Sequence, residues 1–143
     1  FITYDYSKFK GGIWSDRRRD LKDIWDGELK YDFRDKDVFL DDTIKEISTI
    51  LQNNKCLLLC DGGDKPREIQ IYSEYLQSGS YIMGHDYSPS KEYHQQHHKG
   101  KVWNWLELMD SDVVKTMEQY GLTKSSEYYQ GFCDVVWLCL IKE

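Results

Sequence analysis

The residues best suited to chemistry lie in two short polar segments, Asp61-Gly62-Gly63-Asp64 and His85-Asp86. Carboxylates and imidazoles accept protons, bind divalent ions and orient hydroxyl groups. Each segment directly follows a short apolar run, which is typical of a position just past the end of a buried strand. Two segments that are distant in the sequence could therefore contribute to one site.

The chain around these segments has the pattern strand, helix, strand. Residues 55–60 form a nearly unbroken apolar run, as in a parallel strand that is covered on both faces. Pro66 suits the first turn of a helix, and Gly79 is expected to end that helix before a second strand at residues 80–84. Ligands of open α/β sheets bind at the carboxyl ends of the strands. The residues expected to converge there are Asp61, Asp64, His85 and Asp86.

Strands and helices alternate along the rest of the chain, which is typical of a mostly parallel sheet wrapped by helices. One further helix is expected at residues 16–25. Another is expected behind a Thr43-x-x-Glu46 capping box, and Asn53-Asn54 should end it.

Residues 88–101 form the longest irregular segment, which is polar and directly follows the expected site. Such a segment is a natural lid. It carries His94, His97 and His98, but a zinc site there would lack paired cysteines and a fourth ligand, so the lid is the favoured interpretation.

The pattern of residues 56–87 resembles strands four and five of class I S-adenosylmethionine-dependent methyltransferases. The closest likeness is to the subgroup of macrocin and mycinamicin sugar O-methyltransferases and cephalosporin-hydroxylase-like proteins. The resemblance rests on an apolar strand, Asp61-Gly62, a helix, Leu76-x-x-Gly79, a second apolar strand and His85-Asp86. The resemblance implies a Rossmann-like methyltransferase sheet of the α/β class, mostly parallel with an antiparallel C-terminal strand and with helices on both faces.

The likeness extends to both ends of the chain. Residues 1–5 are similar to the family's second strand, and residues 33–40 are similar to the third. The family's C-terminal strands and helix resemble Trp103-Asn104-Trp105, residues 112–120 and residues 135–141. Trp103 and Trp105 alternate like strand residues, so one would pack inward while the other would border the acceptor pocket. Packing in the core is the favoured role for both.

The resemblance also implies ligands. S-adenosylmethionine would contact residues at the ends of the second, third and fourth strands, with the ribose hydroxyls on Asp5. The cofactor-binding set is Asp5, Tyr6, Asp37, Val38 and Asp61. A divalent metal such as Mg²⁺ would be held by Asp61, His85 and Asp86. Because His85 stands where the family has an acid, and imidazole suits softer metals, a metal-free pocket in which the two aspartates cap strand ends remains the alternative.

The resemblance to this family also indicates candidates for a general base. The family has a histidine three residues after its first metal ligand, and this chain has Asp64 there, which could instead cap the helix at Pro66. His85 is the better candidate because histidine titrates near neutral pH, although a structural role bonded to a backbone carbonyl is an alternative. The catalytic candidates are His85, Asp64 and Asp61.

One part of the family pattern has no counterpart. The first strand and its glycine-rich loop are missing, since Gly11-Gly12 and Gly62-Gly63 follow the wrong strands. We therefore expect residues 1–143 to form a single methyltransferase-like domain that corresponds to the C-terminal two-thirds of a complete one. An upstream segment or a second copy of the chain would complete the sheet, and without it the chain should bind cofactor poorly.

Composition limits the class of partner. The chain has 143 residues and a formal net charge of −6, so a nucleic-acid backbone is not an expected partner. No apolar run approaches the roughly 20 residues of a membrane span, so no membrane partner is expected. The four cysteines lie in expected strands, as buried thiols do, which favours a reducing, cytoplasmic setting.

Two functions of different classes remain. The first is an O-methyltransferase that acts on a small molecule or a sugar. The second is a non-catalytic methyltransferase-like module for binding or assembly. Glycosyl transfer or other nucleotide-dependent chemistry on a related sheet is a distant third.

Overall fold

The computed structural model describes residues 2–4, 32–34 and 36–143. The chain divides into two compact units, Phe1–Thr43 and Ile44–Glu143, and each unit is described by itself. The helix predicted at residues 16–25 lies outside the described residues, as do Asp5 and Tyr6.

The first unit contains two short parallel strands, β1 (Ile2–Tyr4) and β2 (Asp32–Arg34), paired with Ile2 opposite Asp32. Both strands were predicted, but the second does not continue to Leu40. Residues 38–40 turn instead. The side chain of Asp37 accepts the backbone N–H of Phe39 at 2.9 Å, a local bond that stabilises a turn rather than a strand.

Helix α2 (Asp41–Asn53) spans the boundary between the units. It begins before Thr43, so the predicted capping box at Thr43 is wrong. Asp41 and Asp42 occupy the first turn, where negative charge is favourable to the helix dipole. The helix ends at Asn53 as predicted, and the Asn53 side chain donates to the carbonyl of Thr49 at 2.6 Å.

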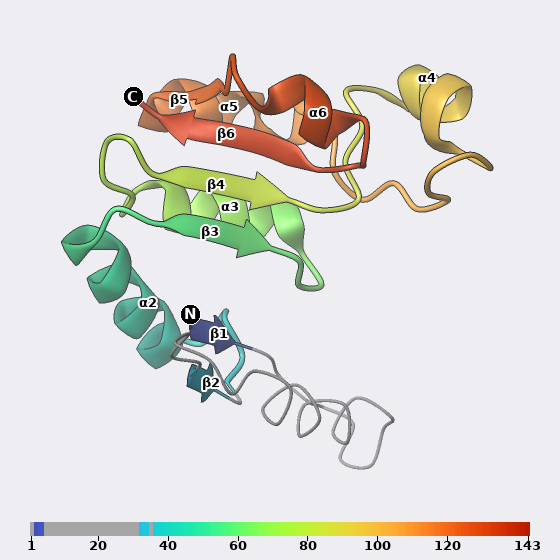
Figure 1. The fold of residues 1–143 in the computed structure, drawn as a ribbon. Coiled ribbons are helices and arrows are strands. Elements are labelled where there is room, and N and C mark those ends of the chain that lie inside the picture. The colour runs from blue at the N-terminus through green and yellow to red at the C-terminus, as the bar shows by residue number, and fades with distance from the viewer. Residues whose placement is uncertain (1, 5–31, 35) are drawn as a thin grey trace, which may run out of the picture. The chain divides into compact units, whose positions relative to one another are not determined.

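The second unit is built on a four-stranded sheet with the order β3-β4-β6-β5 (Figure 1). Its strands are β3 (Leu57–Cys60), β4 (Tyr81–Gly84), β5 (Leu122–Lys124) and β6 (Leu138–Lys142). Strand β3 is parallel to β4, whereas β6 is antiparallel to both β4 and β5. The α/β class and the antiparallel C-terminal strand are confirmed. The sheet is mixed, however, so a mostly parallel sheet is not confirmed.

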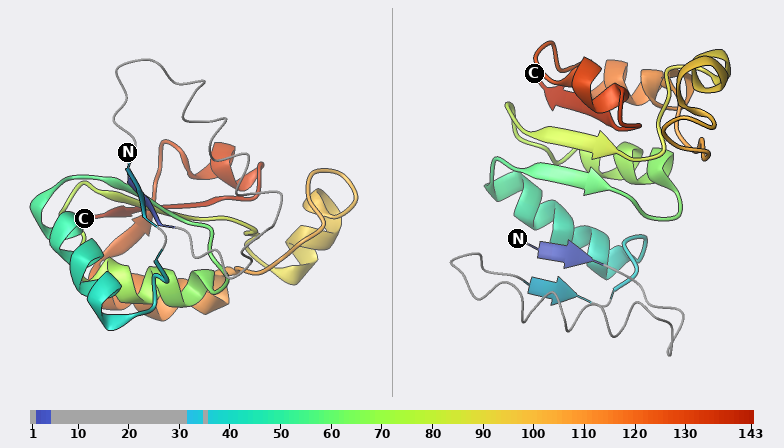
Figure 2. Two further views of the ribbon diagram at one scale, coloured as in Figure 1. Left: turned by 90° about the horizontal axis from the view of Figure 1, so that it is seen from below. Right: turned by 45° about the vertical axis from the view of Figure 1, so that its right-hand side comes forward.

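Helices cover the two faces of this sheet unequally. Figures 1 and 2 show α3 (Lys65–Ser73) and α5 (Asp110–Tyr120) side by side on one face, and the short α6 (Tyr129–Cys133) on the other. The most deeply buried side chains include those of Ile69, Ile82, Leu108, Val113, Leu138 and Leu140.

The predicted burial of β3 on both faces is wrong. Alternate residues of a strand point to opposite faces, and Leu57 and Leu59 are 58% and 45% exposed, while Cys60 is 1% exposed. Cys60 is paired with Gly84, at which an added Cβ would collide with Leu108 and crowd Ile69 of α3. The α3 face of β3 is therefore packed, and the opposite face is open within the second unit.

Helix α3 begins as predicted, with Pro66 in its first turn and Asp64 as its N-cap. An oxygen of Asp64 accepts the backbone N–H of Arg67 at 3.2 Å. The helix ends at Ser73, so the prediction that Gly79 ends it is wrong. Gly79 has a φ of +80° and lies in the turn before β4, where its N–H donates to the carbonyl of Lys142 at 2.8 Å.

The prediction that residues 88–101 form an irregular segment is wrong. They contain α4 (Lys91–Tyr93) and a single π-helical turn, η1 (His94–His98). His94 and His98 are buried, and Ser88 Oγ lies 2.6 Å from Nδ1 of His98. Buried hydrogen bonds thus order the segment, and its role as a lid stays a prediction.

Residues 103–105 do not form a strand, contrary to the prediction. Trp105 is 64% exposed and Trp103 is 39% exposed, so core packing is also wrong for both. The strand that sequence analysis missed is β5, directly after α5. No helix in the described part of the chain is both long and apolar enough to cross a membrane.

Candidate functional site

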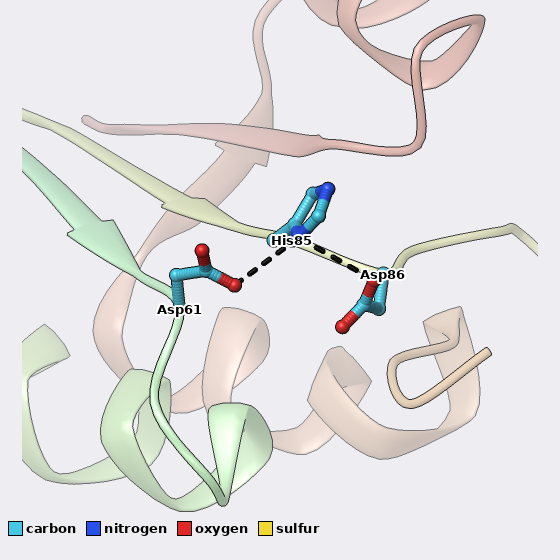
Figure 3. Close-up of side chains that lie close together, drawn as sticks. All are labelled: Asp61, His85 and Asp86. Atoms are coloured by element: carbon cyan, nitrogen blue, oxygen red, sulfur yellow. Dashed lines mark hydrogen bonds and ion pairs between the residues drawn. The ribbon is translucent and has the colours of Figure 1, made fainter. Parts of the chain in front are cut away.

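Three of the predicted site residues meet at the carboxyl ends of β3 and β4. Asp61 follows β3, and His85 and Asp86 follow β4 (Figure 3). One side-chain ligand atom from each lies within 4.8 Å of the others. The pairing of the parallel strands continues past their ends, because the N–H of His85 donates to the carbonyl of Cys60 at 3.2 Å. The predicted grouping of these three residues, here called the strand-end cluster, is confirmed.

His85 is the centre of the strand-end cluster. Its Nδ1 lies 3.1 Å from Oδ1 of Asp61 and 3.4 Å from Oδ1 of Asp86. The imidazole lies near two indoles, with its ring centroid 4.6 Å from that of Trp137 and 5.5 Å from that of Trp103. Figure 3 shows the other ring nitrogen, Nε2, facing away from both carboxylates. A proton on Nδ1 can therefore be held by Asp61 while Nε2 accepts a proton from a ligand.

Lys65, which sequence analysis missed, is the cation of this region. Its side chain is 4% exposed, and its Nζ lies 2.6 Å from Oε2 of Glu107 and 2.8 Å from Oδ2 of Asp86. Asp61 is farther away, with 3.9 Å between its Oδ1 and the same Nζ. Lysine is almost never fully buried unless it is paired. No local pattern in the sequence signals the contact between Lys65 and Glu107, because the two residues are 42 positions apart.

The backbone around Asp86 is fixed by an unusual conformation. Asp86 has a φ of 57°, in the left-handed region that non-glycine residues seldom adopt. Its carbonyl accepts the N–H groups of Glu107 at 3.0 Å and of Leu108 at 3.2 Å, and the side chain of Glu107 contacts Lys65. Val136 is also left-handed, with a φ of 62°, and its carbonyl accepts the N–H of Tyr87 at 2.9 Å. Each such residue costs roughly 1–3 kcal/mol, so the surrounding packing must hold both.

The charges of Lys65 and Asp86 stabilise each other. Burial would lower the pKa of Lys65, but hydrogen bonds to Asp86 and Glu107 and the charges of these carboxylates outweigh burial and raise it. Burial would raise the pKa of Asp86, but hydrogen bonds from Lys65 and Trp103 and the charges of Lys65 and His85 lower it. Both groups are therefore ionised at neutral pH.

Glu68, a second residue that sequence analysis missed, lies beneath the loop that carries Asp61. Burial raises its pKa to about 7, although Lys65 and the Gly62 backbone act in the opposite direction. Its Oε1 is buried and has no hydrogen-bond partner in the described part of the chain. A Cβ at Gly62 would collide with that oxygen, so a larger residue at this position would require the Glu68 carboxyl group to move.

The donor set fits a hard divalent ion poorly. Oδ1 of Asp86 accepts Nε1–H of Trp103 at 2.5 Å, and Oδ2 of the same residue accepts Lys65. Asp61 and Nδ1 of His85 bond to each other. Mg²⁺ prefers an octahedral shell of oxygen ligands, and it would have to bind beside an ammonium group. Metal binding by the strand-end cluster stays a prediction that this geometry does not favour.

Asp64, the other predicted site residue of the second unit, is not a member of the strand-end cluster. Asp64 caps α3, which is one of its two predicted roles. Asp37 and Val38 belong to the first unit, and Asp5 and Tyr6 lie outside the described residues. Among the described residues, His94, His97 and His98 do not form a group with metal-site geometry. All four cysteines are free thiols, and Cys60, Cys133 and Cys139 are buried.

Comparisons of this chain with protein-family models, with curated proteins and with solved structures found no match.

Proposed function

We propose that this protein is an S-adenosylmethionine-dependent methyltransferase that acts on an oxygen of a small molecule or a sugar. The observation that carries the proposal is the Asp61–His85 pair at the ends of two adjacent parallel strands, with 3.1 Å between Oδ1 and Nδ1. This is the place at which ligands of α/β sheets bind. The antiparallel β6 and the resemblance of residues 56–87 to the family's fourth and fifth strands support the same proposal.

In this mechanism His85 is the general base. Asp61 holds the proton on Nδ1 and stabilises the imidazolium that forms, so Nε2 can take the proton of the acceptor hydroxyl group. S-adenosylmethionine, when bound, supplies a methyl group on a positively charged sulfur. The proton released by the acceptor oxygen is kept on His85 until solvent removes it.

The acceptor would lie against the indoles that flank His85. Trp103 is 39% exposed and donates its indole N–H to Asp86, which fixes the plane of its ring. A fixed and partly exposed aromatic ring suits the apolar face of a sugar or of another ring compound. The resemblance implies that Asp61, which directly follows β3, would contribute to holding the cofactor.

The test measures binding and transfer with the full-length protein. S-adenosylhomocysteine binding is followed by calorimetry, and transfer of a labelled methyl group from S-adenosylmethionine is followed on a panel of sugars and small hydroxyl compounds. His85→Gln should lower kcat by about a hundredfold to ten-thousandfold and leave cofactor affinity within about twofold. Glu118→Gln, at an exposed position of α5, is the control and should retain full activity.

Two outcomes would reject the proposal. A full-length protein that does not bind S-adenosylhomocysteine is not a methyltransferase of this kind. A protein that binds it, yet transfers no methyl group to any acceptor, supports the non-catalytic module instead.

A further inference from the structure

The position expected for a metal ion is bordered by a side chain that already carries positive charge. Lys65 begins α3, and its Nζ contacts Asp86 at 2.8 Å and Glu107 at 2.6 Å. Its side chain is 4% exposed, so bulk water contributes little to solvating the ammonium group. These carboxylates supply the solvation that water would otherwise give.

Asp86 is the residue for which a metal ion and Lys65 would compete. Its two oxygens are engaged by different donors, Trp103 on Oδ1 and Lys65 on Oδ2. A divalent ion on either oxygen would have to displace one of these donors or lie within a few ångströms of the ammonium. Repulsion between like charges at such a distance is strong in a poorly hydrated site. Only Asp61 and His85 would remain as ligands, and these two already bond to each other.

We propose that Lys65 is the resident cation of this site and takes the place of a divalent metal ion. Asp86 and Glu107 are then its counterions, not metal ligands. The backbone bonds from Glu107 and Leu108 to the left-handed Asp86 serve to hold this ion pair together. Any role of the Lys65 charge in methyl transfer rests on the proposed function. The exclusion of a metal ion by Lys65 does not depend on that function.

The test is a titration of the full-length protein with Mn²⁺ alone, followed by electron paramagnetic resonance of the free ion. Mn²⁺ accepts both carboxylate and imidazole ligands. The wild-type protein should show no saturable binding at the strand-end cluster up to millimolar Mn²⁺. Lys65→Met, which keeps the length of the side chain and removes its charge, should bind Mn²⁺ at least tenfold more tightly. Adding Asp86→Asn to that variant should abolish the gain.

Lys91→Met is the matched control, because it removes the same charge at an exposed position of α4. It should bind no more Mn²⁺ than the wild-type protein, which separates a local effect from the change in net charge. Circular dichroism and thermal unfolding establish that each variant is folded.

The inference is overturned if the wild-type protein binds Mn²⁺ with micromolar affinity and Asp86→Asn removes that binding. It is also overturned if folded Lys65→Met binds no more tightly than the wild-type protein, because the lysine would then not be what excludes the metal. If Lys65→Met does not fold, Lys65→Gln, which also removes the charge, takes its place with the same expected gain and the same overturning result. None of these measurements uses turnover, so their outcome is separate from that of the methyltransferase proposal.

Discussion

Lys65 and Glu68 are neighbours on α3, but only the charge of Lys65 is stabilised by close partners of opposite charge. The ammonium of Lys65 has carboxylate partners at 2.6 and 2.8 Å, whereas Oε1 of Glu68 is buried without a hydrogen-bond partner among the described residues. Glu68 also lies near the negative charges of Asp61 and Asp64, which raise its pKa further. Its ionisation should therefore oppose folding, while that of Lys65 supports it.

Glu68→Gln should consequently stabilise the protein at pH 8. Folding raises the pKa of Glu68 from 4.5 to about 7, so the folded state keeps its proton to higher pH than the unfolded chain. The free energy of unfolding of the wild-type protein should fall as the pH rises from about 4.5 to about 7 and stay lower above that. The decrease amounts to about 3 kcal/mol, and Glu68→Gln should remove it.

Urea unfolding between pH 4.5 and 8 measures this effect. The exposed Glu118→Gln on α5 removes the same charge and should leave the shape of the wild-type pH profile intact. Parallel profiles for Glu68→Gln and the wild-type protein would show that Glu68 titrates alike in the folded and unfolded states.

At the scale of elements, a single residue sets the direction in which the chain leaves α5. Gly121 has a φ of 63° and donates its N–H to the carbonyl of Met117 at the end of the helix. Leu122 then begins β5, which pairs with β6 at the edge of the sheet. The left-handed conformation turns the chain from helix to strand at one position, and glycine adopts it without the steric cost that a Cβ brings.

Gly121→Ala should destabilise the protein by about 1–2 kcal/mol. No atom of the described residues lies within 4 Å of a Cβ built at this position, so the cost would be conformational rather than a clash. Gly131→Ala in α6 is the matched control, since a Cβ there also meets open space and no positive φ is required. It should be neutral or stabilising by up to about 1 kcal/mol. Equal losses for both variants, measured by thermal unfolding, would contradict this explanation.

For the molecule as a whole, the unequal cover of the four-stranded sheet is the main feature of the second unit. Helices α3 and α5 cover one face, and α6 lies over the other (Figure 2). The ring of Tyr81 packs against that of Tyr128, at the start of α6, with 5.9 Å between centroids. Strand β3 pairs only with β4 in this sheet and leaves Leu57 and Leu59 exposed. Exposed apolar residues on an edge strand promote association.

Replacing both leucines, Leu57→Thr and Leu59→Thr, should therefore change the free energy of unfolding by less than about 1 kcal/mol and reduce self-association. Leu58→Thr is the control on the packed face and should cost about 1–3 kcal/mol. Chemical unfolding and sedimentation velocity measure the two effects. A double variant as unstable as Leu58→Thr would show that this face is covered in solution.

The sequence by itself determined the strand–helix–strand segment around the site and the three members of the strand-end cluster. The apolar runs, Pro66 and the Asp64 cap predict β3, α3 and β4, because these signals act over a few residues. The meeting of Asp61, His85 and Asp86 follows as well, since neighbouring parallel strands end at the same edge of a sheet.

Only the tertiary structure decided what surrounds those three residues. Lys65, Trp103, Glu107 and Trp137 reach the strand-end cluster through the sheet order, the left-handed Asp86 and Val136, and the bonds of residues 107 and 108 to the Asp86 carbonyl. An apolar run also does not reveal which of its faces a helix will cover, so the exposure of Leu57 and Leu59 was not predictable. Contacts between distant segments depend on the whole chain closing around its core, and that closure placed an ammonium group beside the residues that the resemblance had implied as metal ligands.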